Sequence, residues 1–262
     1  MTEREGLMYQ IIGKISETNA PMVFKGALIT KLILRDHNYT ATERPTQDID
    51  ANWIGSPPTM ETLADAVNQS LGVLGDTVCA EIEREYGIGQ TAGLRFVNLK
   101  NGEQLITMDV EIKPVIGSKL YHYGEMAIRG VLPDAVLGDK ISVLSGDRIF
   151  RRSKDVLDVY ALANCLNVRT ADIYNALEKA ERVLGTFEAF ITRRSDLEHA
   201  YNKMRGVIGK PDFDNVYSFL GKFLEPFIQH DKAPKIWHGN AVSWNGADER
   251  ARQKQRSDRD AR

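Results

Sequence analysis

The sequence predicts an α/β (α+β) fold: a mixed sheet with flanking helices, followed by a helical C-terminal lobe. Residues 22–50 have the pattern strand, helix, strand. From about 76 to 113 apolar residues recur at every second position, which is typical of strands. From Pro133 onward the spacing changes to three and four, which is typical of helices. These three observations place the sheet before the helices.

The chain is expected to form two lobes with a cleft between them. The predicted boundaries are 1–130 for the α/β lobe, 131–246 for the helical lobe and 247–262 for a disordered charged tail. With 262 residues there is enough chain for two cores.

Composition narrows the class of protein. A hydrophobic content of 42%, a charged content of 27% and a net charge of −2 indicate a globular protein without general affinity for polyanions. Two cysteines cannot form a disulfide framework, and the five histidines lack zinc-ligand spacing. The N-terminus lacks the order of a signal peptide, and no apolar run has membrane-spanning length. We therefore expect a soluble cytoplasmic protein with no membrane partner.

The first strand and helix form a candidate anion site. The short apolar run at Met22 precedes Gly26, where the backbone can turn sharply into a helix. Leu28, Ile29 and Leu32 recur on that helix at three-to-four spacing. A helix N-terminus offers free N–H groups and a positive dipole end to an anion.

Two carboxylates follow on the next strand. Asp48 and Asp50 share one strand face, whereas Ile49 points the opposite way. Such a pair is often a solvated edge, and this alternative stays open from the pair alone. Next to an anion-binding helix, however, the carboxylates suit Mg²⁺, which prefers oxygen ligands and leaves positions for phosphates.

The remaining helices and strands of the α/β lobe follow from local signals. Residues 5–16 have helical periodicity, and Thr59 is predicted to cap another helix. Asn101-Gly102 predicts a hairpin, and its second arm places Asp109 and Glu111 on the less apolar face. Asp109 is a candidate third metal ligand or simply part of a wet sheet face, and Glu111 is left undecided.

In the helical half, Lys140 lies on the apolar stripe of a helix predicted over 134–146. A buried ammonium is costly, so Lys140 is expected to reach water, a carboxylate or a phosphate. Ser153 is predicted to cap the next helix, on which Asp158 is spaced to pair with Lys154. Thr170 is predicted to cap a further helix, and packing is expected for the late tryptophans Trp237 and Trp244.

The run from Phe24 to Leu28 and the run Arg44-Pro45-Thr46-Gln47-Asp48-Ile49-Asp50 resemble nucleotidyltransferases of the AbiEii/AbiGii toxin type, members of the polymerase-beta-like superfamily. The likeness continues through the strand ending at Glu111, the Asp139-Lys140 pair, and Arg148 followed by the run from Lys154 to Tyr160. One departure is Gly26-Ala27, at a place where the superfamily commonly has Gly-Ser or Gly-Gly. The serine hydroxyl is therefore missing unless Thr30 or a backbone N–H replaces it.

The resemblance implies roles for particular residues. Asp48, Asp50 and Asp109 are expected to bind Mg²⁺. The catalytic set adds the side chains Lys140 and Asp155, with a purely structural role for Asp155 equally open. The expected nucleotide-binding residues are Lys25, Gly26, Ala27, Thr30, Lys140 and Arg148.

The resemblance also implies the activity. We expect magnesium-dependent transfer of a nucleotide from an NTP to an acceptor, with tRNA favoured, by the toxin of a toxin–antitoxin or phage-abortive-infection system with a cognate antitoxin partner. A small-molecule nucleotidyltransferase and a non-catalytic nucleotide-binding module are the alternatives. RNA binding by a net-negative body requires a local positive rim, and the basic residues Arg148, Arg151, Arg152 and Lys154 are its candidates.

Overall fold

The computed structural model describes residues 2–86, 91–112 and 117–246, and the predicted disordered tail lies outside this range. The chain divides into two compact units, Met1–Arg35 with Arg44–Val136, and Asp36–Glu43 with Leu137–Arg262. The first contains a seven-stranded mixed sheet and the second is mainly helical, so the predicted α/β (α+β) class is confirmed.

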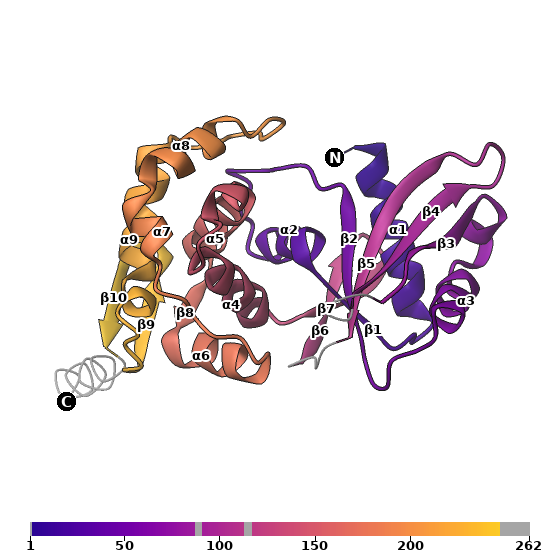
Figure 1. Ribbon diagram of the computed structural model, residues 1–262, viewed down its shortest axis with the longest axis horizontal. Helices are drawn as coiled ribbons and strands as arrows, with labels where there is room; N and C mark the ends of the chain where they lie inside the picture. Colours follow the sequence, from indigo (N-terminus) through magenta and orange to yellow (C-terminus); the bar gives the residue numbers. More distant parts are fainter. Residues whose placement is uncertain (1, 87–90, 113–116, 247–262) are drawn as a thin grey trace, which may run out of the picture. The chain divides into compact units, whose positions relative to one another are not determined.

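In the first unit the strand order is β3-β4-β5-β2-β1-β7-β6 (Figure 1). The pairs β2–β5 and β1–β7 are parallel and the others antiparallel, which makes the sheet mixed. The strands are β1 Met22–Lys25, β2 Asp48–Trp53, β3 Val78–Arg84, β4 Thr91–Asn98, β5 Gln104–Ile112, β6 Ser118–Tyr123 and β7 Met126–Val131. The helices are α1 Glu3–Glu17, α2 Gly26–Asp36, α3 Met60–Ser70 and the 3-10 helix η1 Gly72–Asp76.

The sheet separates apolar from polar side chains on its central strands. Ile49, Ala51, Met108 and Val110 of β2 and β5 are completely buried. Helix α1 packs along β7 and β1, and α3 packs on β3. Since side chains alternate along a strand, burial of these apolar residues turns Asp50 and its neighbours to the other face.

Local sequence signals set several element ends. The Thr59 hydroxyl accepts a hydrogen bond from the Thr62 N–H at 3.1 Å, which confirms the predicted cap of α3. The predicted hairpin joins β4 and β5, and Gly102 has a φ of +70° in its turn. Helix α1 occupies the region predicted from 5–16.

The second unit combines helices with a three-stranded sheet of order β10-β9-β8. Its helices are α4 Pro133–Leu144, α5 Ser153–Cys165, α6 Thr170–Lys179, α7 Glu188–Thr192, α8 Arg194–Asn202 and α9 Phe213–Ile228, with 3-10 helices η2 Ile149–Arg151 and η3 Gly239–Ala241. The strands are β8 Asn167–Arg169, β9 Lys235–His238 and β10 Ser243–Gly246. These strands have three or four residues, which is too short for alternation to reveal them in the sequence.

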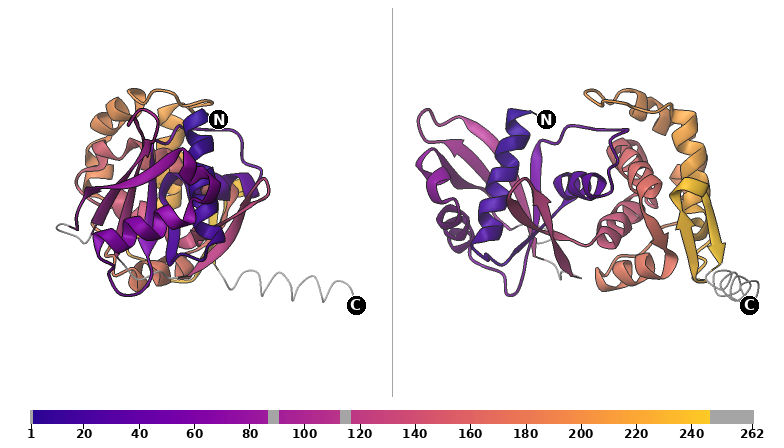
Figure 2. Two further views of the ribbon diagram at one scale, coloured as in Figure 1. Left: turned by 90° about the vertical axis from the view of Figure 1, so that its right-hand side faces the viewer. Right: turned by 180° about the vertical axis from the view of Figure 1, so that it is seen from behind.

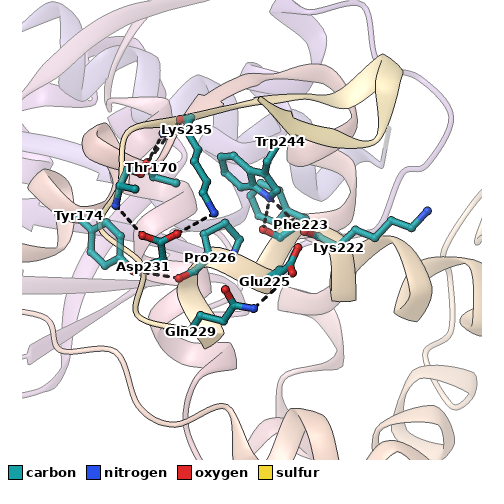
Figure 3. Close-up of polar contacts among 11 residues, drawn as sticks. Thr170, Tyr174, Lys222, Phe223, Glu225, Pro226, Gln229, Asp231, Lys235 and Trp244 are labelled. Carbon is teal, nitrogen blue, oxygen red and sulfur yellow. Dashed lines mark hydrogen bonds and ion pairs between the residues drawn. The ribbon is translucent and has the colours of Figure 1, made fainter. Parts of the chain in front are cut away.

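Both late tryptophans pack in the second unit, as predicted. Trp237 is completely buried, and its indole N–H donates to the Ala163 carbonyl at 2.7 Å. Trp244 stacks on Phe223, and its N–H lies 3.1 Å from the carbonyl oxygens of Lys222 and Phe223 (Figure 3). Figures 1 and 2 show the β9–β10 hairpin that carries them lying along α9.

Two predicted caps are wrong. Helix α5 begins at Ser153 itself, and no side chain caps it. Thr170 is the first residue of α6, where its hydroxyl donates to the Ala233 carbonyl and accepts from the Lys235 N–H (Figure 3). A completely buried hydroxyl needs both bonds, so tertiary contacts outweigh the local capping preference.

Candidate functional site

Three of the predicted carboxylates share one face of the first unit's sheet. Asp50 on β2 is in register with Lys25 on β1 and with Asp109 on β5. Residues in register on neighbouring strands project to the same side, and Asp48 joins them because it lies two positions from Asp50. Ile49 between the two acids is completely buried on the opposite face. The sheet therefore presents Asp48, Asp50 and Asp109 on one side.

Gly26 is required where α2 begins. Its φ is +66°, and a Cβ at this position would collide with the Asp50 carboxylate. Glycine therefore allows the helix N-terminus to approach the acid side chain. Ala27, the second residue of the helix, follows directly. The predicted nucleotide-binding backbone at Gly26-Ala27 thus begins beside Asp50.

We expect Gly26→Ala to destabilise the protein by about 2–5 kcal/mol, through left-handed backbone strain plus displacement of Asp50. Gly102→Ala is the matched control, because Gly102 has a φ of +70° and nothing within 4 Å of an added Cβ. This control is expected to cost only about 1–2 kcal/mol. Urea unfolding of both variants measures the difference, and equal losses would show that the Asp50 contact has no weight.

The side chains expected to bind the nucleotide from α2 and β1 have other partners in the structure. The Lys25 ammonium lies 2.8 Å from Glu111 Oε2, in a pair that is largely buried. Thr30 is 2% exposed, and its hydroxyl donates to the Gly26 carbonyl at 2.9 Å. In the structure the Thr30 hydroxyl is thus used within the helix, and its contact with a phosphate stays a prediction.

Asp109 forms an ion pair that the sequence did not reveal. Arg84 Nη2 lies 2.8 Å from Asp109 Oδ1, and both side chains are about half exposed. Arg84 and Asp109 are each in register with Gly93 of β4, which lies between them. Because glycine has no side chain there, Arg84 reaches across β4. An exposed ion pair of this kind contributes little to stability. A divalent metal ion can therefore replace Arg84 as the partner of Asp109.

The donor set fits a hard divalent cation by its chemistry. Carboxylate oxygens on one sheet face are ligands that Mg²⁺ accepts. Within the described residues no three His, Cys, Asp or Glu side chains are gathered as a metal cluster. Asp109 is directed to Arg84 instead. Metal binding therefore requires Asp109 to leave that arginine, or involves Asp48 and Asp50 first.

The second unit contains a separate buried charge cluster. Lys140 on α4 is 7% exposed, and its ammonium lies 2.6 Å from Asp158 and 3.0 Å from Asp155 on α5. The sequence left water, a carboxylate or a phosphate open as the partner of Lys140, and in the structure Lys140 is paired with carboxylates. The predicted pairing of Asp158 with Lys154 is wrong, because Asp158 faces the interior. Phosphate contact by Lys140 and a catalytic role for Asp155 stay predictions.

We expect Lys140→Met to lower the free energy of unfolding by about 3 kcal/mol, because Asp158 would stay buried without its cation. Adding Asp158→Leu should recover most of this loss, since a buried ion pair is replaceable by apolar packing. Lys235→Met is the control, as its pair with Asp231 is more exposed. Denaturant unfolding measures all three variants, and additive losses in the double variant would contradict the coupling.

Calorimetric titration of the folded Lys140→Met variant with NTP tests the phosphate contact of Lys140.

A basic stretch from Arg148 to Lys154 precedes and opens α5. Its cations are exposed, and none of them forms an ion pair with a described residue: Arg148, Arg151, Arg152 and Lys154. The ring of Phe150 lies 5.8 Å from the Arg151 guanidinium and 5.1 Å from that of Arg193. Sequence reasoning missed Arg193, because it joins the stretch only through folding. We call these six residues the basic surface.

Comparison with known proteins gives a family match over most of the chain. Residues 11–226 match the family described as nucleotidyl transferase AbiEii toxin of the type IV toxin–antitoxin system. No curated protein matches significantly.

None of the described helices has the length and hydropathy to span a membrane.

Two solved structures are similar at low sequence identity. The nucleotidyltransferase toxin MenT4 of Mycobacterium tuberculosis H37Rv is 13% identical with a TM-score of 0.44, over 87% of this chain and 90% of its own. An antigenic nucleotidyltransferase-like protein of Paracoccidioides brasiliensis is 15% identical with a TM-score of 0.43, over 76% and 92%. The family match carries the assignment, and these structures add no argument to it.

Proposed function

The chain belongs to the AbiEii family of nucleotidyl transferase toxins of type IV toxin–antitoxin systems, and on this premise we propose a specific reaction. The protein transfers a nucleotide from an NTP to RNA, with tRNA as the acceptor class and Mg²⁺ as the metal, in the cytoplasm. A single observation carries the proposal: Asp50 lies in register between Lys25 and Asp109 and against the start of α2 at Gly26.

The acids bind the metal and the acceptor. Asp48 and Asp50 hold Mg²⁺, whose charge stabilises the triphosphate and makes the acceptor hydroxyl more acidic. Asp109 leaves the exposed Arg84 and accepts the hydroxyl proton. The hydroxyl oxygen forms a bond to the α-phosphorus, the bond from that phosphorus to the bridging oxygen breaks, and pyrophosphate leaves with the electron pair.

The N-terminus of α2 supplies donors for the phosphates. Backbone N–H groups at Gly26 and Ala27 replace the hydroxyl that the common Gly-Ser would provide, because Thr30 is already engaged. Lys25 adds positive charge beside them, moderated by Glu111. A preorganised helix end of this kind stabilises developing negative charge without a serine.

The basic surface supports RNA as the acceptor. Four exposed cations within seven residues carry no ion-pair partner among the described residues, and unneutralised arginines favour phosphate contact. By contrast, Arg193 of the basic surface pairs with Asp196, and the adjacent Arg194, the first residue of α8, pairs with Asp214. A small acceptor would need no such surface.

Incubation with each labelled NTP, Mg²⁺ and total cellular RNA tests the proposal on a denaturing gel. Label in bands of tRNA size supports it. Label found only in small molecules would favour the small-molecule nucleotidyltransferase. NTP binding without transfer to any acceptor would favour the nucleotide-binding module.

A further inference from the structure

Glu5 is a buried carboxylate that the proposed reaction does not use. It lies on α1, is 2% exposed, and its Oε1 accepts two hydrogen bonds from different parts of the first unit. One comes from the Lys31 ammonium of α2 at 2.5 Å, and the other from the backbone N–H of Thr46 at 3.1 Å. A single oxygen thus joins α1, α2 and the segment that leads into β2.

The contacts continue from Thr46 to the metal-site acid. Thr46 is 4% exposed, and its hydroxyl has two acceptors on Asp48: the carboxylate oxygen Oδ1 at 3.3 Å, which is the nearer, and the backbone carbonyl oxygen at 3.5 Å. Arg4 of the same helix α1 donates to the Gln47 carbonyl at 2.9 Å. Two side chains of the first turns of α1 therefore bind the residues immediately before Asp48.

Stability alone does not explain this arrangement. Burial of a carboxylate and an ammonium is expensive, and apolar side chains of similar size often serve as well for folding. Burial raises the pKa of Glu5, but the hydrogen bonds from Lys31 and Thr46 outweigh it and hold the pKa below its ordinary value. Glu5 is therefore a fixed anion at neutral pH. What an apolar pair cannot supply is a directed acceptor for the Thr46 N–H.

We infer that Glu5, Lys31 and Thr46 are positioning residues that fix the orientation of the Asp48 carboxylate for the divalent cation. Lys31 holds Glu5, Glu5 holds the Thr46 backbone, and the Thr46 hydroxyl fixes one carboxylate oxygen. The inference rests on the proposed function, because the metal role of Asp48 is itself proposed there.

The decisive pair of variants is Thr46→Val and Thr46→Ser. Valine keeps the shape and the backbone N–H but lacks the hydroxyl, whereas serine keeps the hydroxyl. We expect Thr46→Val to weaken Mn²⁺ binding to the nucleotide-free protein and to lower kcat, each by about tenfold, because it removes a hydrogen bond to a charged group. The KM for NTP and the Tm should stay close to the parent's, and Thr46→Ser should restore Mn²⁺ affinity. Electron paramagnetic resonance of free Mn²⁺ gives the affinity without any activity assay.

A second arm tests the link from α1. Glu5→Leu with Lys31→Met replaces the ion pair by apolar side chains, and we expect a folded protein with the same loss of Mn²⁺ affinity. Glu17→Gln on the same helix is the control, since its pair with Lys14 is exposed, and it should behave as the parent. Should the double variant fail to fold, the Thr46 pair decides alone.

Asp48→Asn separates the inference from the proposed function. If Asp48→Asn weakens Mn²⁺ binding while Thr46→Val and the Glu5 double variant bind as the parent does, the positioning role is wrong. If Asp48→Asn itself binds Mn²⁺ as the parent does, the metal site of the proposed function is wrong.

Discussion

Replacing both Asp48 and Asp50 by asparagine should abolish metal-dependent nucleotidyl transfer, with a loss of about a thousandfold or more, and leave the fold intact. Metal binding supplies several kcal/mol of transition-state stabilisation, and a neutral amide is a poor substitute for a carboxylate ligand. The two acids lie two positions apart on one face of β2, so removing their charges relieves repulsion. The Tm should therefore stay constant or rise.

Labelled transfer and thermal unfolding measure the two effects. Glu61→Gln with Asp65→Asn on α3 removes the same charge from an exposed helix surface, and it should keep full activity. An Asp48 and Asp50 double variant that unfolds, or that transfers label as well as the parent, would make the pair structural and the proposed site wrong.

Arg151→Glu with Arg152→Glu should sharply reduce transfer to RNA while NTP binding stays unchanged. Removing one cation that binds a phosphate reduces the magnitude of the negative slope of log affinity against log salt by about one, and the inserted glutamates also repel the RNA backbone. Both arginines are exposed, so the substitution should not lower the Tm. Gel assays of labelled RNA at several salt concentrations and calorimetry with NTP measure the two properties.

The control for this variant is Lys203→Glu with Arg205→Glu. These residues are also exposed, lie in the same unit and change the net charge equally, yet they are outside the basic surface. Control and test variants with RNA labelling equal to the parent's would remove the basic surface from the proposal. Equal reductions in both would show a general charge effect instead.

Several features followed from the sequence because short-range rules determine them. Alternation along β2 placed Asp48 and Asp50 on one face and buried Ile49 on the other. The Thr59 cap and the hairpin turn at Gly102 depend on a few neighbouring residues, so local chemistry was sufficient. The run from Phe24 to Leu28 and the acid pair carried the family resemblance, which the family match over most of the chain confirms.

Partners of charged side chains did not follow from the sequence. Lys140 lay on an apolar stripe, and only the packing of α4 against α5 shows that Asp155 and Asp158 surround it. Thr170 had the signal of a cap, but its hydroxyl binds the segment at Ala233 and Lys235. Sequence spacing predicts which residues share a face, whereas partners more than one turn away depend on how the elements pack.

The sequence by itself determined two features of the first unit: the acids Asp48, Asp50 and Asp109 lie on the polar face of the sheet, and a helix begins at Gly26. Only the tertiary structure decided how these residues are held. It brought Arg84 to Asp109 across β4 at Gly93, where no side chain stands in the way, and it placed Glu5 between Lys31 and Thr46. The physical reason is that periodicity along a chain fixes the direction of each side chain, while the energy of a buried charge depends on distant residues that come together only in the folded state.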